Sequence, residues 1–161
     1  MNETTRMSNL VIGHGMIVLL IGLLSGFGLI FSLMDAIALW PLPAIEVAIP
    51  GTTRGWQAAH VGGILNGVMM AGIALLITRF ELTSKRLLWV GWGMIITGWG
   101  NTLFYFAGNL SQNRGLSMGD TPFGPADIWG ALSFVGGAGA MLFTIVATII
   151  LAITAFERTK A

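Results

Sequence analysis

Cysteine is absent from this chain, and charged residues are scarce. Without cysteine, the chain cannot form disulfides, hold an iron–sulfur cluster or offer a thiolate to a metal or a haem. Only 9% of its 161 residues are charged and 55% are hydrophobic, with a mean hydropathy of +0.81. Soluble globular domains average about 25% charged residues, so the composition indicates an integral membrane protein. A net charge of +1 offers no basic surface to nucleic acid.

Four long apolar segments predict four membrane-spanning helices, because one span needs about 20 apolar residues. They cover approximately residues 8–34, 56–78, 87–108 and 126–156. The two longer loops, residues 35–54 and 109–125, are too rich in proline, glycine and polar residues to continue a helix or to lie in lipid. The predicted fold class is therefore all-α, a single transmembrane domain over residues 1–161 built as a four-helix bundle.

Residues at the ends of these segments bear on how the segments begin and end. The first segment could instead be a secretory signal, since residues 36–38 imitate a small-x-small cleavage site. Its length, well beyond the about 7–15 residues of a signal's apolar region, favours a spanning helix. Thr52 or Thr53 suits the N-cap of the second helix, and Pro125 with Asp127 suits the start of the fourth.

Lysine and arginine are distributed unevenly between the two ends of the predicted bundle. The end with both termini and the connection between the second and third helices carries Arg6, Arg79, Lys85, Arg86, Arg158 and Lys160. The other end carries Arg54 and Arg114. Because positive residues favour the cytoplasmic side, six against two predicts that both termini lie in the cytoplasm.

Polar side chains inside the membrane are the candidate functional residues. The second segment, GWQAAHVGGILNGVMM, holds His60 and Asn66, about 6 Å and about 15 Å below the outer surface at 1.5 Å per residue. In the third segment, Thr97, Asn101 and Tyr105 are spaced four residues apart and predict one polar stripe on one helix face, in the same outer half. Because ionisable groups in membranes are functional as a rule, these residues indicate a shared pocket.

Purely structural roles compete with a pocket. A histidine within the membrane can simply bond a neighbouring helix, and Asn, Thr and Tyr often hold helices together. Gly63 with Gly67, and Gly136 with Ala140, form small-xxx-small patterns whose ordinary meaning is close helix packing. His60 alone makes no motif, so composition and spacing leave both interpretations open.

His14 is the second histidine of the chain. It enters from the opposite side of the membrane, about 9 Å deep, and so lies in the other half of the bilayer from His60. Since two axial nitrogens must flank one iron atom, this pair cannot ligate one haem within a subunit, which counts against a bis-histidine electron-transfer cytochrome. Two alternatives remain: a membrane b-type cytochrome subunit whose second ligand comes from a partner, and a haem-free transporter or assembly protein.

Several segments together carry a family resemblance. They are PGTTRGWQAAHVGGILNGVMM, GWGNTLFYFAGNLSQNRGLSMG and FGPADI, with GHG around His14. In order and spacing they resemble the styrene oxide isomerase family of small bacterial membrane proteins, from the first helix into the start of the fourth. The resemblance implies a homotrimer in the bacterial inner membrane that uses haem b, with ferric iron, to isomerise styrene oxide or a related aryl epoxide to phenylacetaldehyde or the corresponding aldehyde.

Carried over residue by residue, the resemblance implies that His60 is the axial ligand of the haem iron, with Asn66 and Tyr105 on the substrate side. The family pattern has an aspartate at the start of DGWxN, where this chain has Thr97 in TGWGN. This departure puts in doubt any step that needs a carboxylate there. Asn101 remains a possible pocket residue.

Arg114 is a candidate for binding the cofactor at its edge. From the outer loop its guanidinium could reach a haem propionate, and Asp120 or Asp127 would suit it equally well as partners. The sequence leaves these possibilities open.

The implied chemistry suits these residue types. A ferric haem held by one imidazole keeps its sixth position open and can accept the epoxide oxygen as a Lewis acid. The benzylic C–O bond then loosens and a hydride moves from the neighbouring carbon, so no external electrons are needed. Tyr105 and Asn66 would donate to or orient the oxygen, while a dry pocket keeps water from trapping the cation.

The spacing of the two polar residues on the second helix makes a further prediction. His60 and Asn66 are six residues apart, so they point about 120° apart around the helix. Both cannot address one haem from the same helix. We therefore expect each haem to lie between subunits, with His60 from one chain and Asn66 with Tyr105 from the next.

Overall fold

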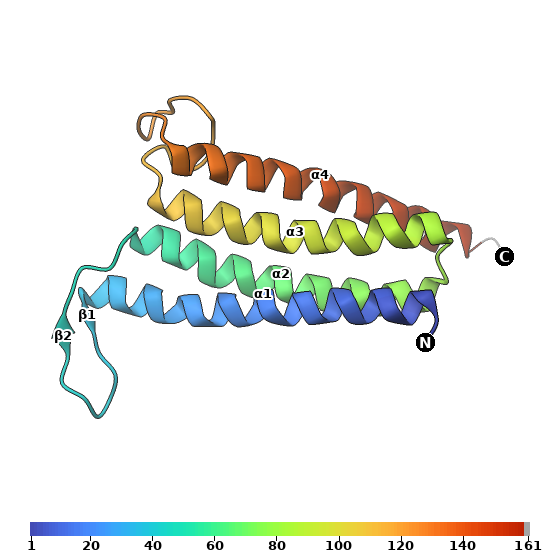
Figure 1. Ribbon diagram of the computed structural model, residues 1–161, viewed down its shortest axis with the longest axis horizontal. Helices are drawn as coiled ribbons and strands as arrows, with labels where there is room; N and C mark the ends of the chain where they lie inside the picture. Colours follow the sequence, from blue (N-terminus) through green and yellow to red (C-terminus); the bar gives the residue numbers. More distant parts are fainter. Residues whose placement is uncertain (160–161) are drawn as a thin grey trace.

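The computed structural model describes residues 1–159 and contains a bundle of long helices with almost no sheet (Figure 1). The helices are α1 (Glu3–Met34), α2 (Thr53–Phe80), α3 (Ser84–Leu110) and α4 (Ile128–Glu157). The predicted all-α four-helix bundle is confirmed. The largest difference from the predicted bounds is the start of α1, because the Asn2 side chain accepts a hydrogen bond from the Thr5 N–H at 2.8 Å and caps the polar first turn.

Three helices, α1, α2 and α4, are long and apolar enough to cross a membrane by length and composition. The 27 residues of α3 fall outside that set because glycines, tryptophans, Thr97 and Asn101 interrupt its apolar residues. This helix nevertheless packs along both α2 and α4 (Figure 1). A fourth span at α3 therefore stays a prediction that this packing supports.

Side-chain caps begin α2 and α4 at the positions that the sequence indicated. The Thr52 hydroxyl accepts a hydrogen bond from the Gly55 N–H at 3.0 Å, and Asp127 accepts one from the Gly130 N–H at 2.6 Å. Such caps satisfy backbone donors that a helix start leaves free. The caps therefore fix where each helix leaves its loop.

A short hairpin that the sequence did not predict follows α1. Strands β1 (Ala36–Ile37) and β2 (Ile45–Glu46) pair antiparallel, with Ala36 opposite Glu46. The hairpin projects beyond the end of α1 (Figure 1). Residues 35–54 were expected to be an extended loop, and two-residue strands are too short to leave an alternating pattern.

Most of the Lys and Arg residues that the structure describes lie at one end of the bundle. The start of α1, the α2–α3 connection and the end of α4 lie together there (Figure 1). At this end Arg86 pairs with Glu157 at 2.5 Å and Arg158 with Glu81 at 3.1 Å. Lys160, which contributes to the predicted orientation, lies outside the described residues. The structure agrees with one charged end, and its assignment to the cytoplasm stays a prediction.

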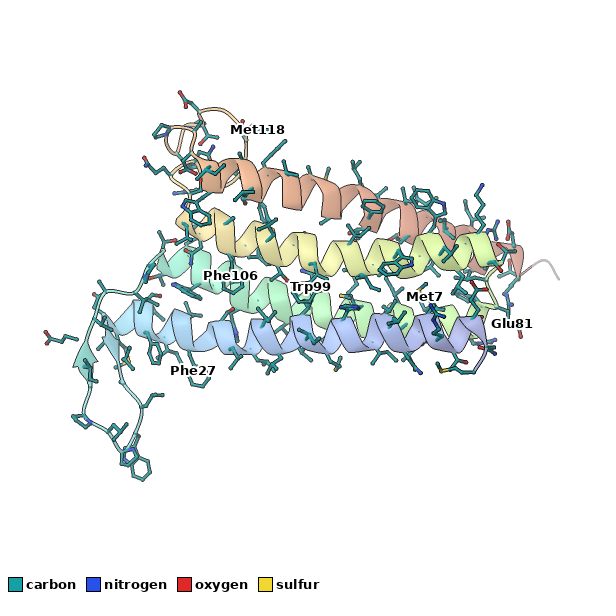
Figure 2. The ribbon with its side chains drawn as sticks, viewed as in Figure 1. Met7, Phe27, Glu81, Trp99, Phe106 and Met118 are labelled. Atoms are coloured by element: carbon teal, nitrogen blue, oxygen red, sulfur yellow. The ribbon has the colours of Figure 1, made fainter. Side chains whose placement is uncertain are left out.

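The apolar core lies in the half of the bundle nearer that charged end. Its buried members are Met7, Val11, Val18, Met70, Ala74, Ile77, Leu82, Leu87, Val90, Met94, Ile95, Ala147 and Leu151. Figure 2 shows Met7 and Glu81 toward this end, and Phe27 and Phe106 toward the other. In the other half, small and polar residues such as Ala59, Asn66 and Ala107 fill the buried positions. The buried apolar core is therefore concentrated in one half of the bundle, whereas the buried positions of the other half are mostly small or polar.

We predict that acid weakens the loop-bearing end of the bundle through Asp127. Backbone N–H groups of Gln112 and Gly130 hold the pKa of the Asp127 carboxyl below its ordinary 3.8. Because the folded-state pKa is the lower one, the stabilisation is present above pH 3.8 and is lost as the pH falls through the lowered pKa. Thermal unfolding in detergent, followed between about pH 6 and about pH 3, measures this loss.

Asp127→Asn is the matched variant, since an amide oxygen still caps the helix but does not titrate in this range. It should be less stable than the parent at neutral pH and lose less stability on acidification. Equal acid sensitivity of the two proteins would contradict the assignment to Asp127.

Candidate functional site

The His60 ring lies half-buried between α2 and α1. Its Nδ1 is 2.9 Å from the Gly22 carbonyl oxygen of α1. A carbonyl oxygen can only accept, so the proton of the neutral ring is on Nδ1, and Nε2 keeps its lone pair. This arrangement, with one ring N–H bonded to a backbone carbonyl, is typical of histidines that ligate metals through the other nitrogen.

An apolar cavity of about 300 Å³ adjoins the His60 ring. Its other lining residues all belong to α1: Leu23, Gly26, Phe27, Leu29 and Ile30. His60 therefore faces an apolar surface on the α1 side of α2. The sequence did not reveal its partner, because Gly22 contributes only a backbone carbonyl.

Asn66 lies on a different face of α2 and is buried, with 6% of its surface exposed. Its amide nitrogen is 2.7 Å from the Gly62 carbonyl oxygen and 3.2 Å from the Tyr105 hydroxyl oxygen of α3. Its amide oxygen accepts a hydrogen bond from the Asn101 side chain at 2.8 Å. The structure therefore brings together three of the predicted residues, Asn66, Asn101 and Tyr105, in one cluster between α2 and α3.

The hydrogen bonds in this cluster have a defined direction. The Gly62 carbonyl can only accept, so the Asn66 atom facing it must be the amide nitrogen, and the oxygen faces Asn101. Both N–H groups of Asn66 are then used, one on Gly62 and one on Tyr105. The Tyr105 oxygen accepts from Asn66, which leaves the Tyr105 hydroxyl proton free to donate to another group.

Thr97 lies outside this cluster. It is fully buried, and its hydroxyl contacts α4, at 3.3 Å from the Ala140 carbonyl oxygen and 2.9 Å from the Thr144 hydroxyl. The expectation of one stripe on one face was therefore wrong for Thr97, although it holds for Asn101 and Tyr105. The reason is that α3 packs between two helices, and its polar residues bond to both.

Arg114 lies at the loop end of the bundle, with its guanidinium carbon 3.8 Å above the Phe123 ring. Within residues 1–159 it forms no ion pair with Asp120 or Asp127, both of which accept hydrogen bonds from backbone N–H groups. Arg114 and Arg54 line an outer cavity of about 470 Å³. The position of Arg114 therefore leaves its charge available to an anionic group at this end.

His14 of α1 and the α1 partner of His60 lie at separate places along that helix. The His14 Nδ1 accepts a hydrogen bond from the Trp99 indole N–H at 3.1 Å. Gly22, the partner of His60, is eight residues further along α1, which corresponds to about 12 Å. The predicted separation of the two histidines is confirmed, so one chain does not present both to a single metal atom.

A family model described as "Styrene oxide isomerase" matches residues 7–156. The chain is also 36% identical over 149 residues to a curated protein of Pseudomonas fluorescens named styrene-oxide isomerase, and the match covers 92% of this chain and 86% of that protein. The chain belongs to the styrene oxide isomerase family. Membership confirms the predicted resemblance and makes the protein an enzyme of the isomerase class.

Each site residue described above lies within the part of the chain that matches the styrene oxide isomerase family model. The aspartate expected at the start of DGWxN is Thr97 here, and its hydroxyl is occupied by α3 and α4. A step that needs a carboxylate at this position is therefore not available to this member of the styrene oxide isomerase family.

We predict measurable coupling between Asn66 and Asn101. Replacing either by leucine removes their hydrogen bond, and a double-mutant cycle should give a coupling energy of about 0.6 kcal/mol, up to about 1.7 kcal/mol, as for other polar pairs in membrane helices. Unfolding of the two single variants and the double variant in detergent measures it.

The control cycle pairs Asn66→Leu with Ser8→Ala. Ser8 bonds the Ala74 carbonyl, eight residues along α2 from Asn66 and about 12 Å away, so these two effects should add. Equal coupling in both cycles would contradict a specific Asn66–Asn101 interaction.

Proposed function

We propose that this protein is a membrane haem b enzyme that isomerises styrene oxide or a related aryl epoxide to the aldehyde. The observation that carries the proposal is the His60–Gly22 hydrogen bond in a chain of the styrene oxide isomerase family. It leaves the His60 Nε2 with a lone pair beside an apolar cavity, as an axial ligand requires.

The donor set supports a haem rather than a metal ion held by side chains alone. Across residues 1–159, no group of three or more His, Asp or Glu side chains is placed to bind a metal ion. A single imidazole would suffice for a haem, because the four porphyrin nitrogens also bind the iron. When bound, the haem would supply Lewis acidity toward the epoxide oxygen.

We assign the Tyr105 hydroxyl as the group that donates a hydrogen bond to the epoxide oxygen during the reaction. Its proton is free, because Asn66 donates to its oxygen, and it can donate to the epoxide oxygen as negative charge builds up there. Asn66 has no free N–H, so its role is to orient Tyr105. The reaction moves one hydride within the substrate, and atoms and electrons balance without a co-reactant.

An apolar surface surrounds the place that we assign to the cofactor. The cavity beside His60 is lined mainly by α1 side chains such as Leu23, Phe27 and Ile30. Such a lining suits the apolar porphyrin. It also helps to keep water away from the site, where water would trap the substrate cation as a diol.

We further propose that each site forms between two copies of the chain in a homotrimer. His60 faces α1, whereas Asn66 and Tyr105 bond each other between α2 and α3. One chain therefore offers the ligand and the hydroxyl on different faces. The cofactor and a neighbouring copy in the bacterial inner membrane would cover the apolar surface beside His60.

The first test of this function combines colour and turnover. The detergent-purified protein should show a haem Soret band and convert styrene oxide to phenylacetaldehyde, both lost in His60→Ala. Tyr105→Phe should keep the Soret band but lose about 10²- to 10³-fold in turnover, as removal of one oxyanion donor does in other enzymes.

His14→Ala is the control, since His14 bonds Trp99 away from the site, and it should keep both colour and activity. A colourless parent protein would refute the haem assignment. A low-spin spectrum with two protein ligands and no isomerase activity would instead support the electron-transfer alternative.

The second test is complementation between subunits. His60→Ala and Tyr105→Phe chains are co-expressed in equal amounts, so that each site draws its two residues independently. If the residues come from different chains, about a quarter of the sites regain both and activity returns in proportion. A double variant, His60→Ala with Tyr105→Phe in the same chain mixed with parent chains, controls for assembly. No recovery in the mixture of single variants would place both residues of a site in one chain.

A further inference from the structure

Glycines bring α1 and α2 unusually close beside His60. A Cβ atom added to Gly22 would lie 2.6 Å from the Gly63 carbonyl carbon, and one added to Gly63 would lie 2.6 Å from the Gly22 Cα. Real Cβ atoms do not approach other atoms this closely, so both positions require glycine. The close approach is what allows the Gly22 carbonyl of one helix to reach the His60 ring of the other.

Gly26 provides the space that the ring occupies. It lies one turn beyond Gly22 on the same face of α1. A Cβ atom there would be 3.0 Å from both Nδ1 and Cε1 of His60 and 3.7 Å from Nε2. Alanine at this position would therefore press on the edge of the ring that donates to Gly22 and tilt that edge away from the carbonyl.

We propose that Gly22 and Gly26 are positioning residues that fix the tautomer and the plane of the His60 ring, and thereby set how strongly its Nε2 donates electrons to a bound iron. An imidazole that donates from Nδ1 to a carbonyl is a more basic ligand through Nε2. The statement about iron rests on the proposed function, whereas the statement about the tautomer does not.

The other histidine provides an internal reference. The Trp99 indole can only donate, so it fixes the His14 Nδ1 as an acceptor and the His14 proton on Nε2. The Gly22 carbonyl can only accept, so it fixes the His60 proton on Nδ1. The two histidines of the chain therefore carry their protons on opposite nitrogens.

The test compares Gly26→Ala with Gly13→Ala on α1 and Gly72→Ala on α2. An added Cβ at either control position meets nothing within 4 Å, so these variants change a glycine in the same two helices without touching the ring. In the pigmented full-length protein, the iron–histidine stretching frequency and the iron midpoint potential are measured. We expect a lower frequency and a higher potential in Gly26→Ala, with both controls equal to the parent. A pigmented Gly26→Ala protein with the parent's frequency and potential would overturn the proposal.

If a protein lacks pigment, nitrogen-15 NMR of histidine-labelled protein shows which ring nitrogen of His60 carries the proton. The signals that disappear in His14→Gln belong to His14, so the remaining ones belong to His60. If Gly26→Ala alone is colourless, a His60 proton moved to Nε2 in that variant supports the proposal, and a proton still on Nδ1 overturns it. If the parent itself is colourless, the proposed haem function fails. The positioning claim then stands only if His60 carries its proton on Nδ1 in the parent and the two glycine controls but not in Gly26→Ala.

Discussion

Close contact between α1 and α2 is the constraint on which the site depends. Glycines at positions 22 and 63 let the two backbones meet, and this contact places a carbonyl oxygen within 2.9 Å of a histidine nitrogen on the other helix. In a bilayer, where lipid is as apolar as a leucine side chain, such packing and interhelical hydrogen bonds are the main forces between helices. The same contact that stabilises the helix pair therefore also determines which nitrogen of His60 is free.

The helical repeat divides the polar residues of α2 between two neighbours. His60 bonds α1, while Asn66, six residues on, bonds Tyr105 and Asn101 of α3. Because these bonds point in different directions, one helix contributes to two separate surfaces. The buried apolar core is concentrated in the half of the bundle nearer the charged end, so this core and the candidate site lie mostly at different levels along the helix axes.

This division lets one helix of a small membrane protein contribute polar groups to two surfaces. The site residues described above lie on helices of one bundle, and polar groups within a membrane must be satisfied inside such a bundle. Within residues 1–159, every buried side-chain nitrogen or oxygen has a hydrogen-bond partner. The cluster around Asn66 meets this requirement while keeping one hydroxyl proton, that of Tyr105, uncommitted.

Composition and local pattern were enough to predict much of this protein. Scarce charge and long apolar segments predicted the all-α membrane class. Thr52 or Thr53 and Asp127 were candidate caps, of which the structure uses Thr52 and Asp127, and the repeat of the α-helix separated His60 from Asn66. These features are local, because each depends on residues that are close together in the sequence. The quoted motifs were also sufficient to identify the family, since they span most of the chain.

Only the tertiary structure decided which groups these residues meet. Gly22 is 38 positions from His60 and contributes a carbonyl that every residue type possesses, so no side-chain pattern could reveal it. The same reason explains Thr97, whose place in a spaced series says nothing about which of two neighbouring helices it will bond. Arg114 contacts Phe123 instead of a carboxylate because the fold of the loop, rather than charge, sets its nearest neighbour.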